Sequence, residues 1–256
     1  MAQPQALASS LDSAGNLYGV TALGGLQSNG VAYELTPAGN GTWNETILYN
    51  FGAAGDGSQP SGDLIFDASG KLYGTTEIGG SLKRGTVFRL TPGAGGWTET
   101  TLYDFSASND GLVPTGVILD TAGNLFGVAR YGGLFGMGRA YELSPATGSW
   151  QETVIHDFTG GSDGYYPAGK LVSDSRRNLY GVAVGGGLHG LGTAYQFSPG
   201  KGGGWNGKIL HQFPQTSFDG FYPDSGPILD GSGNLYGVTQ QGGNGGIGVA
   251  YRLTPN

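Results

Sequence analysis

Four aspartates share a spacing that could serve chemistry. Each precedes a glycine and stands four residues before a proline, and the four are Asp56, Asp110, Asp163 and Asp219. A ring of carboxylates could bind a cation or transfer protons. The simpler interpretation is that each carboxylate accepts backbone N–H groups within a turn that is copied wherever the unit is copied. We favour the turn, and we keep Asp163 and Asp219 as the carboxylates to consider if the protein is an enzyme.

The chain has three histidines, and only two of them occupy a position that recurs between the units. His156 and His211 occupy a position held by Tyr49 and Tyr103 in other units, so we expect both histidines to be structural. His189 has no counterpart and falls in a loop, where an imidazole is either simply solvated or available for proton transfer. His189 is therefore the third catalytic candidate.

Equivalent loops can be compared within this one chain, which separates constant positions from variable ones. The two residues before the loop proline are Ser58 and Gln59 in one unit, but both are aromatic in the loops that begin units 4 and 5. Rings with few fixed charges suit the apolar faces of a sugar or another flat, weakly charged ligand, although they could also pack the loops together. The predicted ligand-binding residues are Arg130, Tyr131, Phe135, Tyr165, Tyr166, His189, Phe221 and Tyr222.

Motifs for cofactors or metals are either absent or out of context. The segment 160–164 fits G-x-S-x-G, but a nucleophile elbow requires a strand-to-helix turn and no helix is expected here. Segments 185–190 and 243–248 fit G-x-G-x-x-G without a following helix to hold a phosphate. The sequence has no cysteine, no HExxH and no three-histidine cluster, so we predict neither a cofactor nor a metal site.

A unit repeated five times positions all of these residues. The motif GNLYG or a close variant recurs so that its leucines fall at 17, 72, 125, 179 and 235. The spacings of 55, 53, 54 and 56 residues are close to the period of about 50 that is typical of kelch propellers. Gly-Gly follows seven residues after each leucine, and an aromatic residue follows sixteen after it.

Each unit is predicted to contain four short strands. Strand A is the apolar run before an Asp-x-x-Gly-Asn turn, strand B is NLYGVT, a glycine-rich B–C loop leads to strand C, AYELTP, and strand D is WxETxLYxF. Such small sheets cannot bury both faces alone, and radial stacking solves this without helices. We therefore predict an all-β, five-bladed β-propeller with mostly four-stranded blades; a linear stack of sheets is the alternative.

The predicted propeller is one domain, and its last blade is incomplete. Strand D does not follow the fifth strand C, so we expect the last blade to lack its outer strand. Either this blade has three strands, or the N-terminal residues or a partner cover its edge, or the sequence is a piece of a longer protein. The domain covers residues 1–256, with units at about 6–51, 60–105, 114–158, 167–213 and 223–256.

The order GNLYGVT, GG, AYELTP and WxETxLYxF resembles the GloVer-type tandem repeat, over nearly the whole chain. The resemblance implies a propeller-like array in a secreted or surface-anchored bacterial protein, and it supplies no catalytic residues. Unit 4 departs from the pattern, because Arg177 replaces the turn glycine and Gly207 and Lys208 replace Glu-Thr.

Composition limits the possible partners. The net charge is −7 with only 12 lysines and arginines, so the chain lacks the basic surface that a nucleic acid requires. We find no apolar run near the length of a membrane span. The N-terminal segment lacks the features of a secretion signal, which leaves the location of the protein undecided. From the resemblance we expect an extracellular or cell-surface location.

These observations favour a secreted or surface-exposed binding module whose ligand is a carbohydrate or another small, weakly charged molecule. Its site is expected at the mouth formed by the D–A and B–C loops of units 3 to 5. The alternatives are a carbohydrate-active hydrolase or lyase, in which Asp163 or Asp219 converges with His189 or Arg130, and a structural or adhesive array without a pocket.

Overall fold

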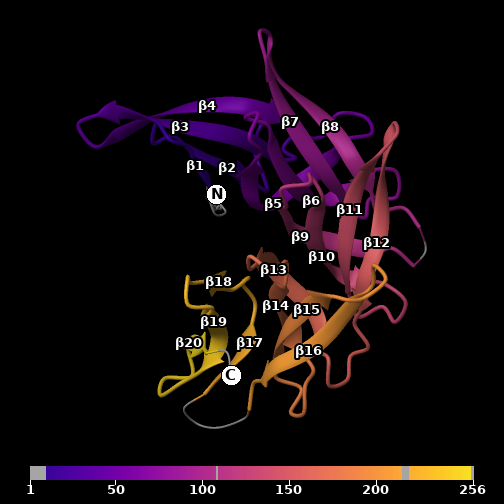
Figure 1. The fold of residues 1–256 in the computed structure, drawn as a ribbon. Helices are drawn as coiled ribbons and strands as arrows, with labels where there is room; N and C mark the ends of the chain where they lie inside the picture. The colour runs from indigo at the N-terminus through magenta and orange to yellow at the C-terminus, as the bar shows by residue number, and fades with distance from the viewer. Residues whose placement is uncertain (1–9, 108, 215–218, 255–256) are drawn as a thin grey trace. The chain divides into compact units, whose positions relative to one another are not determined.

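A computed structural model of the protein describes residues 10–107, 109–214 and 219–254 (Figure 1). The described residues contain strands and no helix, and hence no helix that could span a membrane. The strands form five four-stranded antiparallel sheets, and the fold class is a five-bladed β-propeller, as predicted. The predicted limits of the first and last units, at residues 6 and 256, lie outside the described residues.

Each sheet is one blade, and its strands follow one another in sequence. Blade 1 contains β1 (Ser10–Leu11), β2 (Leu17–Thr21), β3 (Val31–Gly39) and β4 (Thr42–Asn50). Blade 2 contains β5 (Gly57–Phe66), β6 (Leu72–Gly79), β7 (Thr86–Gly93) and β8 (Gly96–Asp104). Blade 3 contains β9 (Gly111–Leu119), β10 (Leu125–Gly132), β11 (Arg139–Ala146) and β12 (Ser149–Asp157). Blade 4 contains β13 (Tyr165–Ser173), β14 (Leu179–Gly185), β15 (Thr193–Pro199) and β16 (Trp205–Gln212).

The chain divides into two compact units. The first comprises the described residues of 1–108, 113–123 and 145–151, and the second those of 109–112, 124–144 and 152–256. Blades 1 and 2 belong to the first unit, blades 4 and 5 belong to the second, and the strands of blade 3 are divided between them.

The turn between strands A and B has the conformation that its sequence predicts. In the first copy, Asp12 Oδ1 accepts the backbone N–H groups of Ala14 and Asn16 at 2.8 and 2.9 Å, and Gly15 has φ +87°. The hydroxyl of Tyr180 donates to Asp174 in the fourth copy, 3.0 Å away, although Arg177 there replaces the glycine and still adopts φ +63°. The aspartate and the tyrosine of strand B therefore fix this turn even where glycine is absent.

A second repeated contact, which we call the blade joint, connects each of the first four blades to the blade that follows it in the chain. In the joint between blades 3 and 4, Tyr166 N donates to Met137 O at 2.9 Å, and Phe158 N donates to Gly138 O at 3.0 Å. A Cβ on Gly138 would lie 2.4 Å from Cδ of Pro167, so the two backbones approach too closely for any side chain there. The same Gly–Pro pairs are Gly30–Pro60, Gly85–Pro114 and Gly192–Pro223.

The joint corrects the expectation that the DGxxP segments are loops. Tyr165 and Tyr166 lie in β13, and Phe221 and Tyr222 lie in β17, because these residues already pair with the next strand of their own blade, as Tyr165 does with Gly185. The residue before each of these prolines nevertheless has a left-handed backbone conformation, which is common in turns. The φ values are +55° at Gln59, +58° at Val113, +57° at Tyr166 and +60° at Tyr222.

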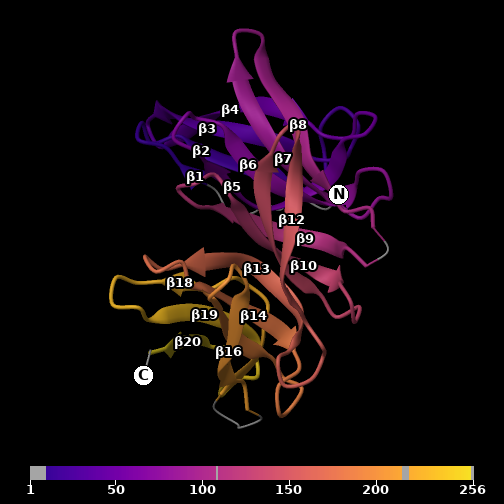
Figure 2. The same ribbon diagram turned by 45° about the vertical axis from the view of Figure 1, so that its right-hand side comes forward.

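The fifth blade contains β17 (Gly220–Pro223), β18 (Ile228–Leu229), β19 (Leu235–Gly242) and β20 (Ala250–Leu253), drawn in yellow in Figures 1 and 2. Strands β17 and β18 both pair with β19, so they are two halves of one interrupted strand A. On the other side of β19 lies β20, and no described strand pairs with the far edge of β20. The last blade therefore lacks its outer strand in the described part of the chain, as predicted.

The blade joint predicts a sharp difference between two glycines of the same loop. Gly138→Ala should lower the free energy of unfolding by about 3 kcal/mol, because the new Cβ meets Pro167 and φ is +106°. Gly136→Ala, at φ +74° with no atom within 4 Å of its Cβ, should cost only about 1 kcal/mol. Urea unfolding of both variants measures the difference, and equal losses would contradict the proposed role of the joint.

Candidate functional site

Three of the predicted ligand-binding residues form one aromatic cluster in the second unit. The ring of Tyr131, which is 38% exposed, lies 4.8 Å from the ring of Tyr166, centroid to centroid. Tyr165 lies 4.9 Å from Tyr166 on the same measure. Its ring covers Gly185 of β14, where a Cβ would be only 2.2 Å from Cζ of Tyr165. The exposed ring of Tyr131 and the edge of this cluster offer a flat apolar surface.

The aromatic residues of blade 5 are committed to packing. Phe221 and Tyr222 contact each other at 5.3 Å and lie against the buried side chains of Val182, Leu191 and Phe213. They therefore help to hold blade 5 against blade 4, and they are less available to a ligand than Tyr131.

The remaining two predicted residues lie in B–C loops. Phe135 is 52% exposed beside Leu134, which is 65% exposed. His189 is exposed beside Leu188 and makes no hydrogen bond or ion pair with the residues that the structure describes. The backbone of each loop is fixed by repeated hydrogen bonds, such as Gly138 N to Gly132 O at 3.0 Å, so these tips are presented on a rigid frame.

Arg130 has a partner that the sequence did not reveal. Its Nη2 lies 2.6 Å from Asp224 Oδ1, and the two side chains are 29% and 27% exposed. Asp224 Oδ2 accepts a hydrogen bond from Gln240 Nε2 at 2.6 Å. Arg130 comes from blade 3, whereas Asp224 and Gln240 come from blade 5, so this network connects two blades that have blade 4 between them.

A comparison of equivalent positions could have singled out the residues of this network, although not their contact. Asp224 follows the joint proline, where the other units have Ser61, Thr115 and Ala168. Gln240 and Arg130 both stand five residues after the leucine of strand B, where other units have Ala22, Glu77 or Val184. Asp224 is the only acidic residue among the four that follow a joint proline, which was the available signal.

The candidates for acid–base chemistry lie in separate surroundings. Asp163 accepts hydrogen bonds from Thr159 N at 2.8 Å and pairs with His156 Nε2 at 3.0 Å. Burial alone would raise the pKa of Asp163, but these hydrogen bonds outweigh it and hold the pKa below its usual value. Asp219 is exposed, and its carbonyl accepts from Gly243 N at 3.2 Å. The described contacts thus join Arg130 to Asp224, and join neither Asp163 nor Asp219 to His189 or Arg130.

The equivalent aspartate of blade 2, Asp56, is buried and forms an acidic pair with the partly buried Glu99. Asp56 accepts hydrogen bonds from Tyr49 Oη at 3.1 Å and from Gly57 N at 2.6 Å. Burial raises the pKa of Asp56, although these hydrogen bonds oppose the rise. Burial, together with the charge of Asp56, also raises the pKa of Glu99 in β8 to about 7.

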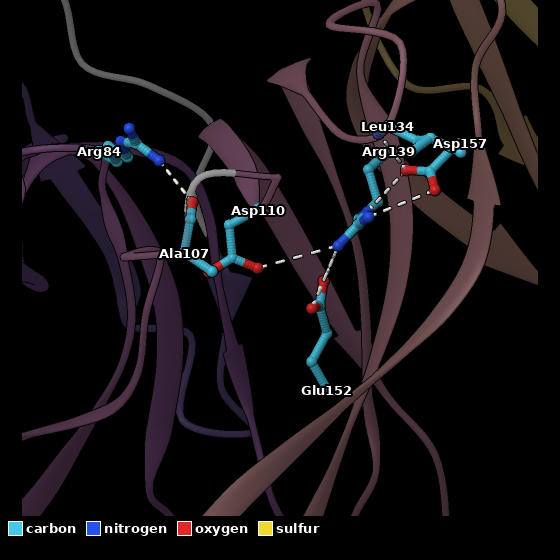
Figure 3. A network of polar contacts seen from close by, with 7 residues as sticks. All are labelled: Arg84, Ala107, Asp110, Leu134, Arg139, Glu152 and Asp157. Atoms are coloured by element: carbon cyan, nitrogen blue, oxygen red, sulfur yellow. Dashed lines mark hydrogen bonds and ion pairs between the residues drawn. The ribbon is translucent and has the colours of Figure 1, made fainter.

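Blade 3 contains a buried arginine that stands out from no sequence motif (Figure 3). Arg139 is 4% exposed, and its guanidinium lies 2.8 Å from Asp157, 3.3 Å from Glu152 and 3.8 Å from Asp110. Asp157 also accepts the backbone N–H of Leu134, which fixes the B–C loop above the cluster. Burial raises the pKa of Glu152; Arg139 opposes the rise, and Asp110 adds to it. The cluster is a support for the loop, since solvent does not reach its arginine.

The Arg130–Asp224–Gln240 network and the aromatic cluster both start from strand β10, at the consecutive residues Arg130 and Tyr131. The network offers hydrogen-bond donors and acceptors without excess charge, and the cluster offers an apolar ring; both features suit a ligand with hydroxyl groups. Among the described residues, no group of three or more His, Cys, Asp or Glu side chains is arranged to hold a metal ion.

Comparisons with known proteins identify the repeat. The family model of the Gloeobacter/Verrucomicrobia repeat matches residues 1–176. A search of curated protein sequences found no match.

Solved structures share the fold at low sequence identity. A gluconolactonase from Xanthomonas campestris is 13% identical with a TM-score of 0.59, over 98% of this chain and 72% of that one. An inulosucrase from Halalkalicoccus jeotgali, bound to kestose, is 12% identical with a TM-score of 0.51, over 90% and 71%. The catalytic domain of an α-L-arabinofuranosidase from Coprinopsis cinerea is 12% identical with a TM-score of 0.50, over 98% and 90%. Identities this low establish likeness of fold alone.

The acidic pair of Asp56 and Glu99 in blade 2 predicts a pH dependence of stability. Because the pKa of Glu99 rises from 4.5 to about 7 on folding, the folded state binds a proton that the unfolded chain releases in this range. Stability should therefore fall as pH rises from 4.5 to 7. Glu99→Gln should make that fall smaller in urea unfolding at several pH values, whereas Glu45→Gln, at the exposed equivalent position in β4, should not. A slope unchanged by Glu99→Gln would contradict this assignment.

The arginine cluster of blade 3 predicts a loss of stability when the charge of Arg139 is removed. Arg139→Thr introduces the residue that stands at this position in blades 2 and 4, and should lower the free energy of unfolding by about 3 kcal/mol at pH 7, because three carboxylates lose their counter-charge. The loss should shrink as the carboxylates become protonated at lower pH. Arg176→Thr, at an exposed site, should change stability by less than about 0.5 kcal/mol. A pH-independent loss would mean that the cluster acts through packing alone.

Proposed function

The chain belongs to the Gloeobacter/Verrucomicrobia repeat family, and we propose that it is a binding module for neutral carbohydrates that acts outside the cytoplasm. The observations that carry the proposal are the exposed ring of Tyr131 and the partly exposed Arg130–Asp224–Gln240 network, which start from consecutive residues of β10. Sugars present both apolar C–H faces and hydroxyl groups; the ring offers a partner for the first, and the network offers partners for the second.

The electrical balance of the network favours a neutral ligand. Arg130 lies 2.6 Å from Asp224, so the charge of each is already compensated by the other. Gln240 adds an uncharged amide to the same carboxylate. A hydroxyl group can donate to Asp224 or accept from Arg130 without breaking the ion pair, whereas a charged ligand would have to displace one partner.

The fold neighbours support the ligand class by analogy. The gluconolactonase, the inulosucrase and the arabinofuranosidase are named for reactions of sugars or sugar derivatives. One propeller fold serves many functions, so the residues named above, and not the fold, carry the proposal.

The test is a screen of neutral oligosaccharides and polysaccharides against the full chain, followed by isothermal titration of each one that binds. Tyr131→Ala should weaken binding at least tenfold, because it removes the exposed ring; tenfold corresponds to about 1.4 kcal/mol. Ile78→Ala, at the equivalent position of β6 and 37% exposed, is the matched control and should leave binding unchanged. Tyr166→Ala is compared with Gln59→Ala, since both positions have the same left-handed backbone.

Three outcomes would overturn the proposal. Release of sugar products by the wild-type chain, lost in Asp224→Asn, would identify a hydrolase or lyase. Binding that Tyr131→Ala and Ile78→Ala weaken equally would place the site elsewhere. The absence of binding to any neutral glycan would leave a structural repeat array.

A further inference from the structure

Four positively charged residues gather at one end of blade 4, in a chain whose net charge is −7. Arg176 and Arg177 lie in the turn between β13 and β14, and Lys201 lies in the hairpin between β15 and β16. Because neighbouring strands of the blade are antiparallel, this turn and this hairpin lie at the same end of it. Lys208 follows in β16, and all four residues are exposed. We call this surface the basic end of blade 4.

The strand register places Lys208 level with the turn. Tyr180 pairs with Gln196, and Gln196 pairs with Lys208. Two steps of about 4.8 Å between strands put Lys208 about 10 Å from Tyr180 across the sheet. The hydroxyl of Tyr180 donates to Asp174 of the turn at 3.0 Å. Lys208 therefore lies about two strand widths from the turn that carries the two arginines.

This positive charge belongs to blade 4 and not to the repeat. Where blade 4 has Arg176 and Arg177, the other four blades have alanine or serine followed by glycine. Where it has Gly207 and Lys208, blades 1 to 3 have glutamate and threonine. Asp174 is common to all blades, and its carboxylate already accepts four hydrogen bonds within its own turn. The basic end has thus gained cations and lost an acidic residue relative to the equivalent blades.

Aromatic rings lie beside the arginines. The guanidinium carbon of Arg177 lies over the ring of Phe126, 5.9 Å from its centroid, which is within the range of a cation–π contact. The ring of Trp205 meets Phe126 edge to face, with 5.8 Å between centroids. Phe126 is 2% exposed, whereas Trp205 is half-buried, so the indole keeps a surface that a ligand can reach. The basic end therefore combines cations with an accessible aromatic ring.

The chemistry of this surface discriminates between anionic partners. The turn 174–178 and the hairpin 200–204 contain no large hydrophobic residue that could enter a lipid bilayer. A nucleic-acid duplex carries one charge per about 1.7 Å and would be repelled by a protein with a net charge of −7. A sugar ring that carries one carboxylate fits both features, since its C–H face can pack on Trp205 while its carboxylate pairs with an arginine.

We propose that the basic end of blade 4 is a second ligand site, which binds a polysaccharide whose sugar rings carry carboxylates. The four basic residues pair with carboxylates of the bound chain, and the indole of Trp205 packs against one of its rings. This site is separate from the proposed site for neutral carbohydrates. Both use β10, but Phe126 stands near its beginning and Tyr131 stands five residues later, about 17 Å along the strand.

Variants that introduce the residues of the other blades test the proposal without new backbone strain. Arg177→Gly restores the turn glycine at a position where φ is +63°, and Arg176→Ala introduces the alanine of blades 1 and 3. Binding of polygalacturonate, alginate and hyaluronan to the full chain is measured by isothermal titration at low salt. We expect the wild-type chain to bind at least one of these polymers. The double variant should bind it about tenfold more weakly, because two charge-assisted hydrogen bonds are lost.

Two matched controls isolate the site and the charge of the ligand. Lys71→Asn removes one cation from the equivalent turn of blade 2 and introduces the asparagine of the other blades, so it should leave binding unchanged where Arg177→Gly alone weakens it. The methyl ester of the bound polymer has the same sugar rings without their charges. It should bind the wild-type chain about tenfold more weakly than the free acid does.

Four results would overturn the proposal. They are no binding to any of the three polymers, equal losses in Arg177→Gly and Lys71→Asn, equal affinity for the acid and its methyl ester, and tighter binding of poly-L-glutamate or duplex DNA than of the polysaccharide. The last result would identify an acidic peptide or a nucleic acid as the partner. The variants leave Tyr131 and Arg130 unchanged, so none of these results depends on whether the chain binds a neutral glycan.

Discussion

The close approach of the loop glycine and the joint proline controls the geometry of this repeat. At each joint the glycine carbonyl accepts the N–H of the phenylalanine that ends strand D, as Gly138 does from Phe158, and the glycine itself leaves no room for a Cβ. The next blade then begins with a residue at positive φ, even where that residue is Val113 or Tyr166. Non-glycine residues accept this conformation at some energetic cost, which the surrounding hydrogen bonds and packing must offset. Because the joint is the same between successive blades, each blade can follow the previous one with the same backbone geometry.

Because the blades share one backbone geometry, a single different residue at an equivalent position can change the local charge and its contacts. The first residue of strand C is Thr86 in blade 2 and Arg139 in blade 3, and the change replaces a small hydroxyl with a guanidinium among three carboxylates. Buried in this way, the charge stiffens a loop. Arg130, on the neighbouring strand, is half-exposed and has one carboxylate partner, so it can meet a ligand. The two arginines differ in role because they differ in solvent access.

Much of the architecture follows from local sequence. The turn aspartates, the strands and the missing outer strand of blade 5 were predicted because each depends on residues that are close in the chain or repeated along it. The predicted DGxxP loops were wrong, because Tyr165 and Phe221 carry turn-like neighbours yet pair with strands β14 and β19. Pairing of that kind depends on the adjacent strand and overrides the local preference of glycine and proline.

The sequence by itself determined the number of blades, their strand order and the positions at which units differ, because periodicity is a property of the chain alone. Only the tertiary structure decided which of those variable residues meet. Asp224 is 94 residues from Arg130, and nothing in the spacing of the repeat indicates that blades 3 and 5 bring these side chains within 2.6 Å. The convergence of strands from non-adjacent blades decides that contact, and a linear pattern does not contain it.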